Sequence, residues 1–302
     1  NLCNRDRHDA DHRTAWRQAG PCDGPQTSQA NLCGISGFRG AEHDPQIAGL
    51  LNSLHKDGFV VFDATDQAAD WASAAHQQAL LISADPAIRA QNLRHGNTWF
   101  VGVDALPNDP DGSIGGAPLA GPWQDYVTVP AAYHRAQLSV VYPGYPLQDG
   151  SESDGAHRFR RNRFAAHVDG LLPRGPQKRR FLEEWHGFIL GLPLNETEAA
   201  PLMVWPESHL YMGAALREAV GQQDPIDVDL TDAYQAARRD VFDKITPVRV
   251  VARPGQSMLL HRHLLHGVAP FDAGHIAPAE GRMIAYLRPM MAAGHKAWLA
   301  AD

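Results

Sequence analysis

Two residues that can bind a metal ion, His167 and Asp169, stand one residue apart in the segment 163–170, which reads RFAAHVDG. On a strand, residues two apart project from the same face, so a strand here would point the imidazole and the carboxylate in one direction. With a second histidine from elsewhere they would form the donor set that covers one face of an octahedral ion such as iron(II) and leaves three positions open. A His-x-Asp pair alone is common by chance, so the prediction depends on a third ligand.

Three histidines, His261, His263 and His266, compete for that role in the segment 254–268, which reads PGQSMLLHRHLLHGV. The pattern indicates a turn, an apolar strand and then a histidine followed by glycine, and we favour His266 as the third ligand. The run is also similar to the signature of dinuclear zinc hydrolases, so a zinc-dependent metallohydrolase using these three histidines is an alternative function. That chemistry needs an acidic residue where Leu265 stands, which counts against it.

An arginine opens the downstream segment 282–288, which reads RMIAYLR. Alternation along a strand sends Arg282, Tyr286 and Arg288 to the same side. A guanidinium group sheltered inside a barrel needs an anionic partner, and the distal carboxylate of 2-oxoglutarate suits its two-pronged donation. An ordinary ion pair at a sheet edge explains the same pattern, and the residues alone leave both interpretations open.

The elements that must position these residues are mostly short strands between turn signals, which predicts an antiparallel barrel or sandwich. The expected strands are 59–62, 136–142, 164–169, 187–194, 202–205, 248–252, 257–261 and 282–288. Apolar residues recur at helical spacing in three other segments, where we expect helices: from Asp44-Pro45 to about Asp57-Gly58, over 66–82 and over 231–242. Residues 93–123 are rich in Gly, Pro, Asn and Asp and are expected to form a loop.

The composition indicates one main globular domain. A chain of 302 residues can bury a substantial core, and 44% apolar with 20% charged residues is typical of globular proteins. The formal net charge of −7 makes nucleic acid an unfavourable partner. No apolar stretch predicts a membrane span or a signal peptide, so we expect no membrane partner and a cytoplasmic protein. Residues 1–40 are expected to form a polar, flexible tail, and residues 41–302 the main domain.

Over about residues 44–290 the chain resembles the phytanoyl-CoA dioxygenase-like branch of iron(II)/2-oxoglutarate oxygenases. The features that carry the resemblance are the helix leading to Lys56-Asp57-Gly58-Phe59-Val60-Val61, the His167-x-Asp169 pair, the turn Val204-Trp205-Pro206-Glu207-Ser208-His209, His266-Gly267 and Arg282. One departure is Glu207, where the family often has glycine. The resemblance implies a mainly β fold with flanking helices, in which a double-stranded β-helix forms a jelly-roll, cupin-like barrel.

The resemblance also implies the chemistry. His167, Asp169 and His266 would bind iron(II), and Arg282 would bind the co-substrate 2-oxoglutarate. With dioxygen, the protein would hydroxylate a small organic molecule and release succinate and carbon dioxide. Asp169 stands where halogenating relatives have a small residue, which favours hydroxylation or another oxidative outcome without halide at the metal. A non-catalytic, cupin-like binding protein is a further alternative, and the sequence leaves open whether copies form a homo-oligomer.

Basic residues on both sides of the His167-Asp169 segment suggest an anionic substrate. They are Arg158, Arg160, Arg161, Arg163, Lys178, Arg179 and Arg180. The other interpretation is a solvated basic face that balances acidic neighbours such as Glu183 and Glu184. Tyr142, Gln137 and Trp205 are further candidates for lining a substrate pocket.

Overall fold

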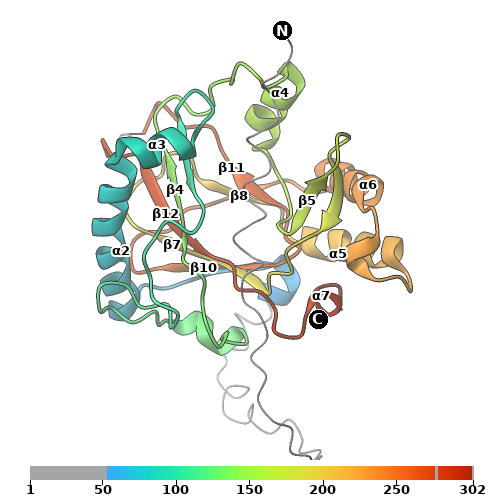
Figure 1. Ribbon diagram of the computed structural model, residues 1–302, viewed down its shortest axis with the longest axis horizontal. Helices are drawn as coiled ribbons and strands as arrows, with labels where there is room; N and C mark the ends of the chain where they lie inside the picture. The colour runs from blue at the N-terminus through green and yellow to red at the C-terminus, as the bar shows by residue number, and fades with distance from the viewer. Residues whose placement is uncertain (1–52, 276–277, 301–302) are drawn as a thin grey trace, which may run out of the picture. The chain divides into compact units, whose positions relative to one another are not determined.

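A computed structural model of the protein describes residues 53–275 and 278–300 (Figure 1). The tail expected over residues 1–40 and the start of the helix expected from Asp44 lie outside the described residues. Residues 53–57 are helical and lead directly into the first strand, so the expected end of that helix is confirmed. None of the described helices is long and apolar enough to cross a membrane.

A seven-stranded antiparallel sheet is the largest element of the described structure. Its strand order is β1-β10-β7-β12-β4-β3-β2, so most neighbouring strands come from distant parts of the sequence. The strands span Phe59–Phe62 (β1), Leu93–Arg94 (β2), Trp99–Gly102 (β3), Gln137–Val141 (β4), Phe188–Pro193 (β7), Ser257–His261 (β10) and Arg282–Leu287 (β12).

A three-stranded antiparallel sheet packs on one face of the large sheet. Its order is β11-β8-β9, and its strands span Leu202–Val204 (β8), Val248–Val250 (β9) and His266–Val268 (β11). One buried cluster joins Leu202, Val204 and Val250 of the small sheet to Ile189, Met258, Leu260 and Ile284 of the large one. The two sheets therefore enclose an apolar layer, as in other face-to-face sheet packings. A separate hairpin consists of β5 (Leu171–Arg174) and β6 (Arg179–Leu182).

Helices cover the outer surfaces of the sheets (Figure 1). Helix α2 (Asp66–Ala84) buries Trp71 and Ala75 in one cluster with Leu138 of β4 and Leu287 of β12, so it covers the other face of the large sheet. Helices α5 (Ser208–Val220) and α6 (Thr231–Lys244) belong to a second cluster, which includes Trp205 next to β8. The remaining helical elements are α3 (Pro86–Asn92), η2 (Pro122–Tyr126), α4 (Asp154–Arg163), η3 (Pro225–Asp227) and α7 (His295–Trp298).

The predicted architecture of antiparallel strands with flanking helices is confirmed. Two local predictions are wrong. The strand expected over residues 164–169 is replaced by a turn after α4, followed by a single bridge at His167. The loop expected over residues 93–123 contains β2, β3 and η2, because the short apolar run Trp99–Gly102 pairs with β4 despite its Gly- and Asn-rich surroundings.

Candidate metal centre

Three potential metal ligands, His167, Asp169 and His266, converge at the edge of the small sheet. One ligand atom from each lies within 4.8 Å of the other two, and no other group of three or more His, Cys, Asp or Glu residues does so among the residues that the structure describes. Asp169 Oδ1 lies 3.2 Å from His167 Nε2 and 3.9 Å from His266 Nε2. This is the two-histidine, one-carboxylate set that suits an octahedral ion with open positions.

The two histidines are held together by their own backbones. His167 N–H donates to the His266 carbonyl at 2.9 Å, and His266 N–H donates to the His167 carbonyl at 3.1 Å. This reciprocal pair is an isolated antiparallel bridge rather than part of a longer strand. Because residues in an extended bridge still alternate, Asp169 projects to the same side as His167, as the sequence pattern predicted.

A tight turn brings His167 to this bridge. Helix α4 ends at Arg163, and the next two residues, Phe164 and Ala165, have left-handed backbones with φ of 58° and 52°. Such angles cost about 1–3 kcal/mol per residue when the residue is not glycine, so the surrounding contacts must maintain the turn. The Phe164 carbonyl accepts a hydrogen bond from Val268 N–H at 3.0 Å, which ties the turn to β11.

Two glycines allow the ligand segments to approach closely. Gly170, directly after Asp169, has φ of +91°, and a Cβ atom there would lie 2.1 Å from the Glu184 carbonyl oxygen. A Cβ atom at Gly267, directly after His266, would lie 2.3 Å from the Phe164 carbonyl oxygen. Any larger residue would therefore push apart the segments that carry the ligands.

Both imidazoles present the same nitrogen to the centre. His167 Nδ1 lies 3.0 Å from the Ala165 carbonyl oxygen, and His266 Nδ1 lies 2.9 Å from the Leu264 carbonyl oxygen. An Nδ1–H that donates to a carbonyl leaves the Nε2 lone pair free, which is how protein histidines are oriented toward metals. A backbone carbonyl therefore orients each ring from the side away from the centre.

The charge states also fit a metal ion. Burial, together with the neighbouring His167, lowers the pKa of His266 to about 4, so this imidazole is neutral at pH 7. Burial alone would raise the pKa of Asp169, but the Arg288 guanidinium and the neighbouring His167 side chain hold it well below its usual value. A neutral imidazole and an ionised carboxylate are the forms in which these groups bind metals.

A cavity of about 90 Å³ adjoins the three ligands between the two sheets. Its wall includes Trp99, Gln137, Tyr145, Phe164, Tyr286 and Arg288. Gln137 thus lines the pocket as the sequence suggested, whereas Tyr142 and Trp205 do not. Arg288 was missed as a site residue, although the same alternation that selected Arg282 also placed Arg288 on the inner face.

Arg282, the expected co-substrate partner, lies on the same face of β12 as Tyr286, but it does not line this cavity. It is opposite Val141 of β4 and is 5% exposed. Its Nη1 atom is buried without a hydrogen-bond partner. The structure therefore holds a buried cationic donor on β12, the strand that Arg288 directly follows.

His261 and His263 are not part of the metal cluster. Their rings lie 5.3 Å apart, and His261 packs on His209 while His263 packs on Trp298. The three-histidine zinc site considered for the alternative function is therefore not formed.

The flanking basic residues do not line the cavity. Arg160 pairs with Glu152 at 3.1 Å, and Arg179 pairs with Asp229 and Asp232. Ion pairs therefore account for these two arginines without an anionic ligand.

Comparison with known proteins finds no matching family model and no matching curated protein. Several solved structures match. The carbocyclase SnoK from nogalamycin biosynthesis, described as non-haem and α-ketoglutarate-dependent, is 15% identical, with 86% of this chain and 92% of SnoK covered and a TM-score of 0.47. EctD from S. alaskensis, solved with 2-oxoglutarate and 5-hydroxyectoine, is 18% identical, with 80% and 74% covered and a TM-score of 0.42.

AviO1 from Streptomyces viridochromogenes is 15% identical, with 80% of this chain and 94% of AviO1 covered and a TM-score of 0.39. EctD has also been solved with bound Fe. These TM-scores lie below 0.5, so any function must be inferred from the geometry of the site itself. The narrower resemblance to phytanoyl-CoA dioxygenases stays a prediction.

Proposed function

We propose that this protein is an iron(II)- and 2-oxoglutarate-dependent oxygenase that acts on a small molecule. The observation that carries the proposal is the convergence of His167, Asp169 and His266 from two segments far apart in sequence. The oriented Nε2 atoms of the two histidines, the charge states of Asp169 and His266, and the adjoining cavity suit an iron(II) ion with open positions. With 2-oxoglutarate and dioxygen, bound iron(II) supplies the oxidation of a substrate carbon–hydrogen bond while succinate and carbon dioxide are released.

Arg282 is our candidate for the residue that binds the distal carboxylate of 2-oxoglutarate. A buried guanidinium whose Nη1 has no partner calls for an anionic ligand, because an unpaired buried charge is costly. The Tyr286 hydroxyl, on the same face of β12 and lining the cavity, is also buried without a partner. Together they supply two donors for a carboxylate that enters from the metal side.

The arrangement of strands supports a double-stranded β-helix as the fold. In the large sheet β10, β7, β12 and β4 are neighbours, and in the small sheet β9, β8 and β11 are neighbours. The His167 bridge extends the small sheet by a fourth segment next to β11. Four adjacent strands of the large sheet thus face the extended small sheet, which carries one ligand pair on its outermost segment and the third ligand on the next. This arrangement supports the barrel that the sequence resemblance implies.

We propose hydroxylation as the outcome. Asp169 would occupy the coordination position that a halide needs, and its carboxylate accepts a hydrogen bond from Arg288. The cavity wall near the ligands is largely aromatic and aliphatic, which favours a substrate with an apolar carbon at the site of oxidation. A small-molecule substrate is therefore expected.

The proposal is tested by adding iron(II) and 2-oxoglutarate to the protein without oxygen. We expect the weak visible charge-transfer band that chelation of 2-oxoglutarate to iron(II) produces. His266→Gln should abolish the band, whereas the control His261→Gln, outside the metal cluster, should retain it. Folded wild-type protein that gives neither the band nor 2-oxoglutarate-dependent succinate would disprove the assignment.

A further inference from the structure

We propose that Arg288 is a positioning residue that holds one oxygen of Asp169, so that only the other oxygen is offered to the metal. The inference rests on the proposed function in so far as it requires a metal at His167, Asp169 and His266. It assigns a task to a residue that neither the ligand set nor the co-substrate site includes.

The two oxygens of Asp169 have different surroundings. Oδ1 faces the Nε2 atoms of His167 and His266 at 3.2 and 3.9 Å. Oδ2 accepts a hydrogen bond from Arg288 Nη1 at 3.3 Å. The Asp169 side chain is only 12% exposed, so water does not replace either contact easily. One oxygen is therefore directed at the metal position and the other is occupied.

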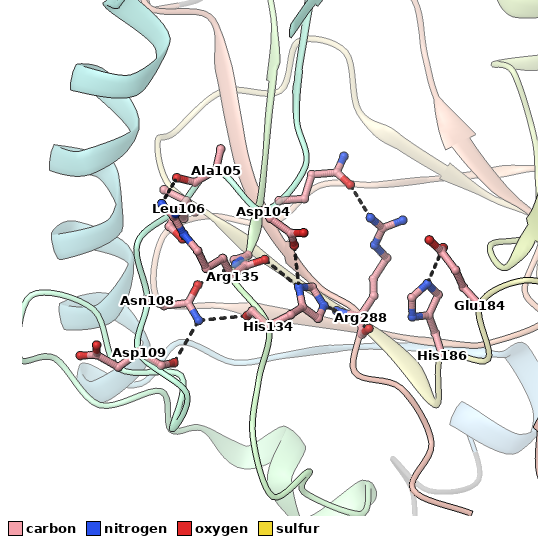
Figure 2. Close-up of polar contacts among 12 residues, drawn as sticks. Asp104, Ala105, Leu106, Asn108, Asp109, His134, Arg135, Glu184, His186 and Arg288 are labelled. Carbon is pink, nitrogen blue, oxygen red and sulfur yellow. Dashed lines mark hydrogen bonds and ion pairs between the residues drawn. The ribbon is translucent and has the colours of Figure 1, made fainter. Parts of the chain in front are cut away.

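Arg288 is itself fixed from several directions (Figure 2). Its Nη2 donates to Gln137 Oε1 on β4 at 2.7 Å. Its backbone N–H donates to His134 Nε2 at 3.2 Å, and Asp104 binds the other ring nitrogen of His134 at 3.1 Å. Glu184 lies on the other side of Arg288 in Figure 2, but its carboxylate accepts from His186 at 2.9 Å.

Single-oxygen binding matters because the coordination positions are limited. An octahedral ion held by His167, Asp169 and His266 would keep three positions open, and the chelating co-substrate and dioxygen would need all of them. If both oxygens of Asp169 bound the ion, one of those positions would be lost. A hydrogen bond to Oδ2 prevents this, and outer-shell partners of this kind typically change metal affinity by about 10–100-fold when removed.

Arg288 also lines the cavity, and its Nε is buried without a partner, so it could instead bind an anionic ligand. The two roles differ in one measurable respect. A residue that only binds a ligand leaves metal affinity unchanged when that ligand is absent, whereas a residue that orients Asp169 does not. Removing the guanidinium also removes a like charge near the ion, which by itself would tighten metal binding.

The experiment is a cobalt(II) titration of the full chain without 2-oxoglutarate, followed by visible absorption. We expect Arg288→Gln to weaken binding about 10–100-fold and Arg288→Lys, which keeps a cationic donor, to recover part of the loss. Arg160→Gln is the matched control, because Arg160 is as buried as Arg288 and also donates to a carboxylate, but it does not line the cavity. We expect it to bind cobalt as the wild type does.

Gln137→Ala is a second variant that separates loss of orientation from a folding defect. It keeps both the Arg288 and Asp169 side chains and removes only the hydrogen-bond acceptor that holds the guanidinium. We expect a smaller loss of cobalt affinity with a thermal unfolding transition close to that of the wild type. Unchanged or tighter binding in Arg288→Gln overturns the inference, as does equal weakening in Arg160→Gln. Wild-type protein that binds no cobalt would instead defeat the proposed function.

Discussion

The close approach of Gly267 to the Phe164 carbonyl leads to a specific prediction: Gly267→Ala will destabilise the fold and loosen the metal site together. A Cβ atom at residue 267 would stand 2.3 Å from the Phe164 carbonyl oxygen and 3.1 Å from its carbon. Both neighbours are backbone atoms, which cannot rotate away as a side chain does. The segments that carry His167 and His266 must therefore separate.

The size of the effect follows from the hydrogen bonds at that contact. Restoring an ordinary carbon–oxygen distance requires a displacement of about 1 Å. Three backbone hydrogen bonds cross the same gap: Val268 to Phe164 at 3.0 Å, and the two between His167 and His266 at 2.9 and 3.1 Å. At about 1 kcal/mol each, their loss lowers the free energy of unfolding by roughly 3 kcal/mol. The same displacement exceeds the tolerance of about 0.5 Å for a preorganised site, so cobalt affinity should fall at least about 10-fold.

Urea unfolding and cobalt titration of the same preparation measure the two effects. Gly150→Ala is the control, because a Cβ atom there meets nothing within 4 Å. We expect the control to unfold at the wild-type urea concentration and Gly267→Ala to unfold well below it. Equal unfolding midpoints in the two variants, with unchanged cobalt affinity, would refute the link between this contact and the site.

Three further predictions concern charge and ligands. Burial lowers the pKa of His266 in the folded chain to about 4, below its ordinary value of about 6.5, so the unfolded chain binds the extra proton between these values. The metal-free protein should therefore lose up to roughly 3 kcal/mol of stability as pH falls from about 6.5 to 4, measured by urea unfolding, and His266→Gln should reduce this dependence. Arg282→Gln should raise the dissociation constant of 2-oxoglutarate at least about 30-fold in the charge-transfer titration, because the replacement removes a buried charge-assisted contact worth about 2 kcal/mol or more. An unchanged dissociation constant would mean that another residue binds the distal carboxylate. Cobalt at about 100 times its dissociation constant should stabilise the fold by about 2.7 kcal/mol in thermal or urea unfolding, and an equal gain in Asp169→Ala would place the ion at another site.

The sequence predicted regular elements best where apolar residues recur over many positions. Helix α2 lies close to its expected bounds because burial on one face determines its periodicity. Strands β10 and β12 also lie close to theirs, because both of their faces are buried and each is a short, mostly apolar run. The segment before His167 was assigned wrongly because a two-residue left-handed turn leaves no apolar pattern. Its basic residues belong to α4, whose described residues include none that are fully buried.

The site was predicted where spacing alone carries the information. His167 and Asp169 face the same way in a strand and in a single bridge, so the error in secondary structure did not affect their pairing. Choosing His266 over His261 depended on the glycine that follows it, and the structure gives the reason in the close approach at Gly267. The contact of Arg288 with Asp169 joins residues 119 positions apart, which no local pattern encodes.

Of the three ligands, His167 alone is half exposed, with 48% of its side chain accessible, against 10% for His266. His167 therefore forms the solvent-exposed side of the site, and Asp169 and His266 form its buried side. Nickel, copper and zinc all bind sets of nitrogen and oxygen donors more tightly than iron(II) does. If the site holds a metal as proposed, its identity depends on which ions are present while the chain folds. Protein produced in zinc- or nickel-rich medium should then contain the wrong metal, and the proposed oxygenase activity should return after chelation and anaerobic reconstitution with iron(II).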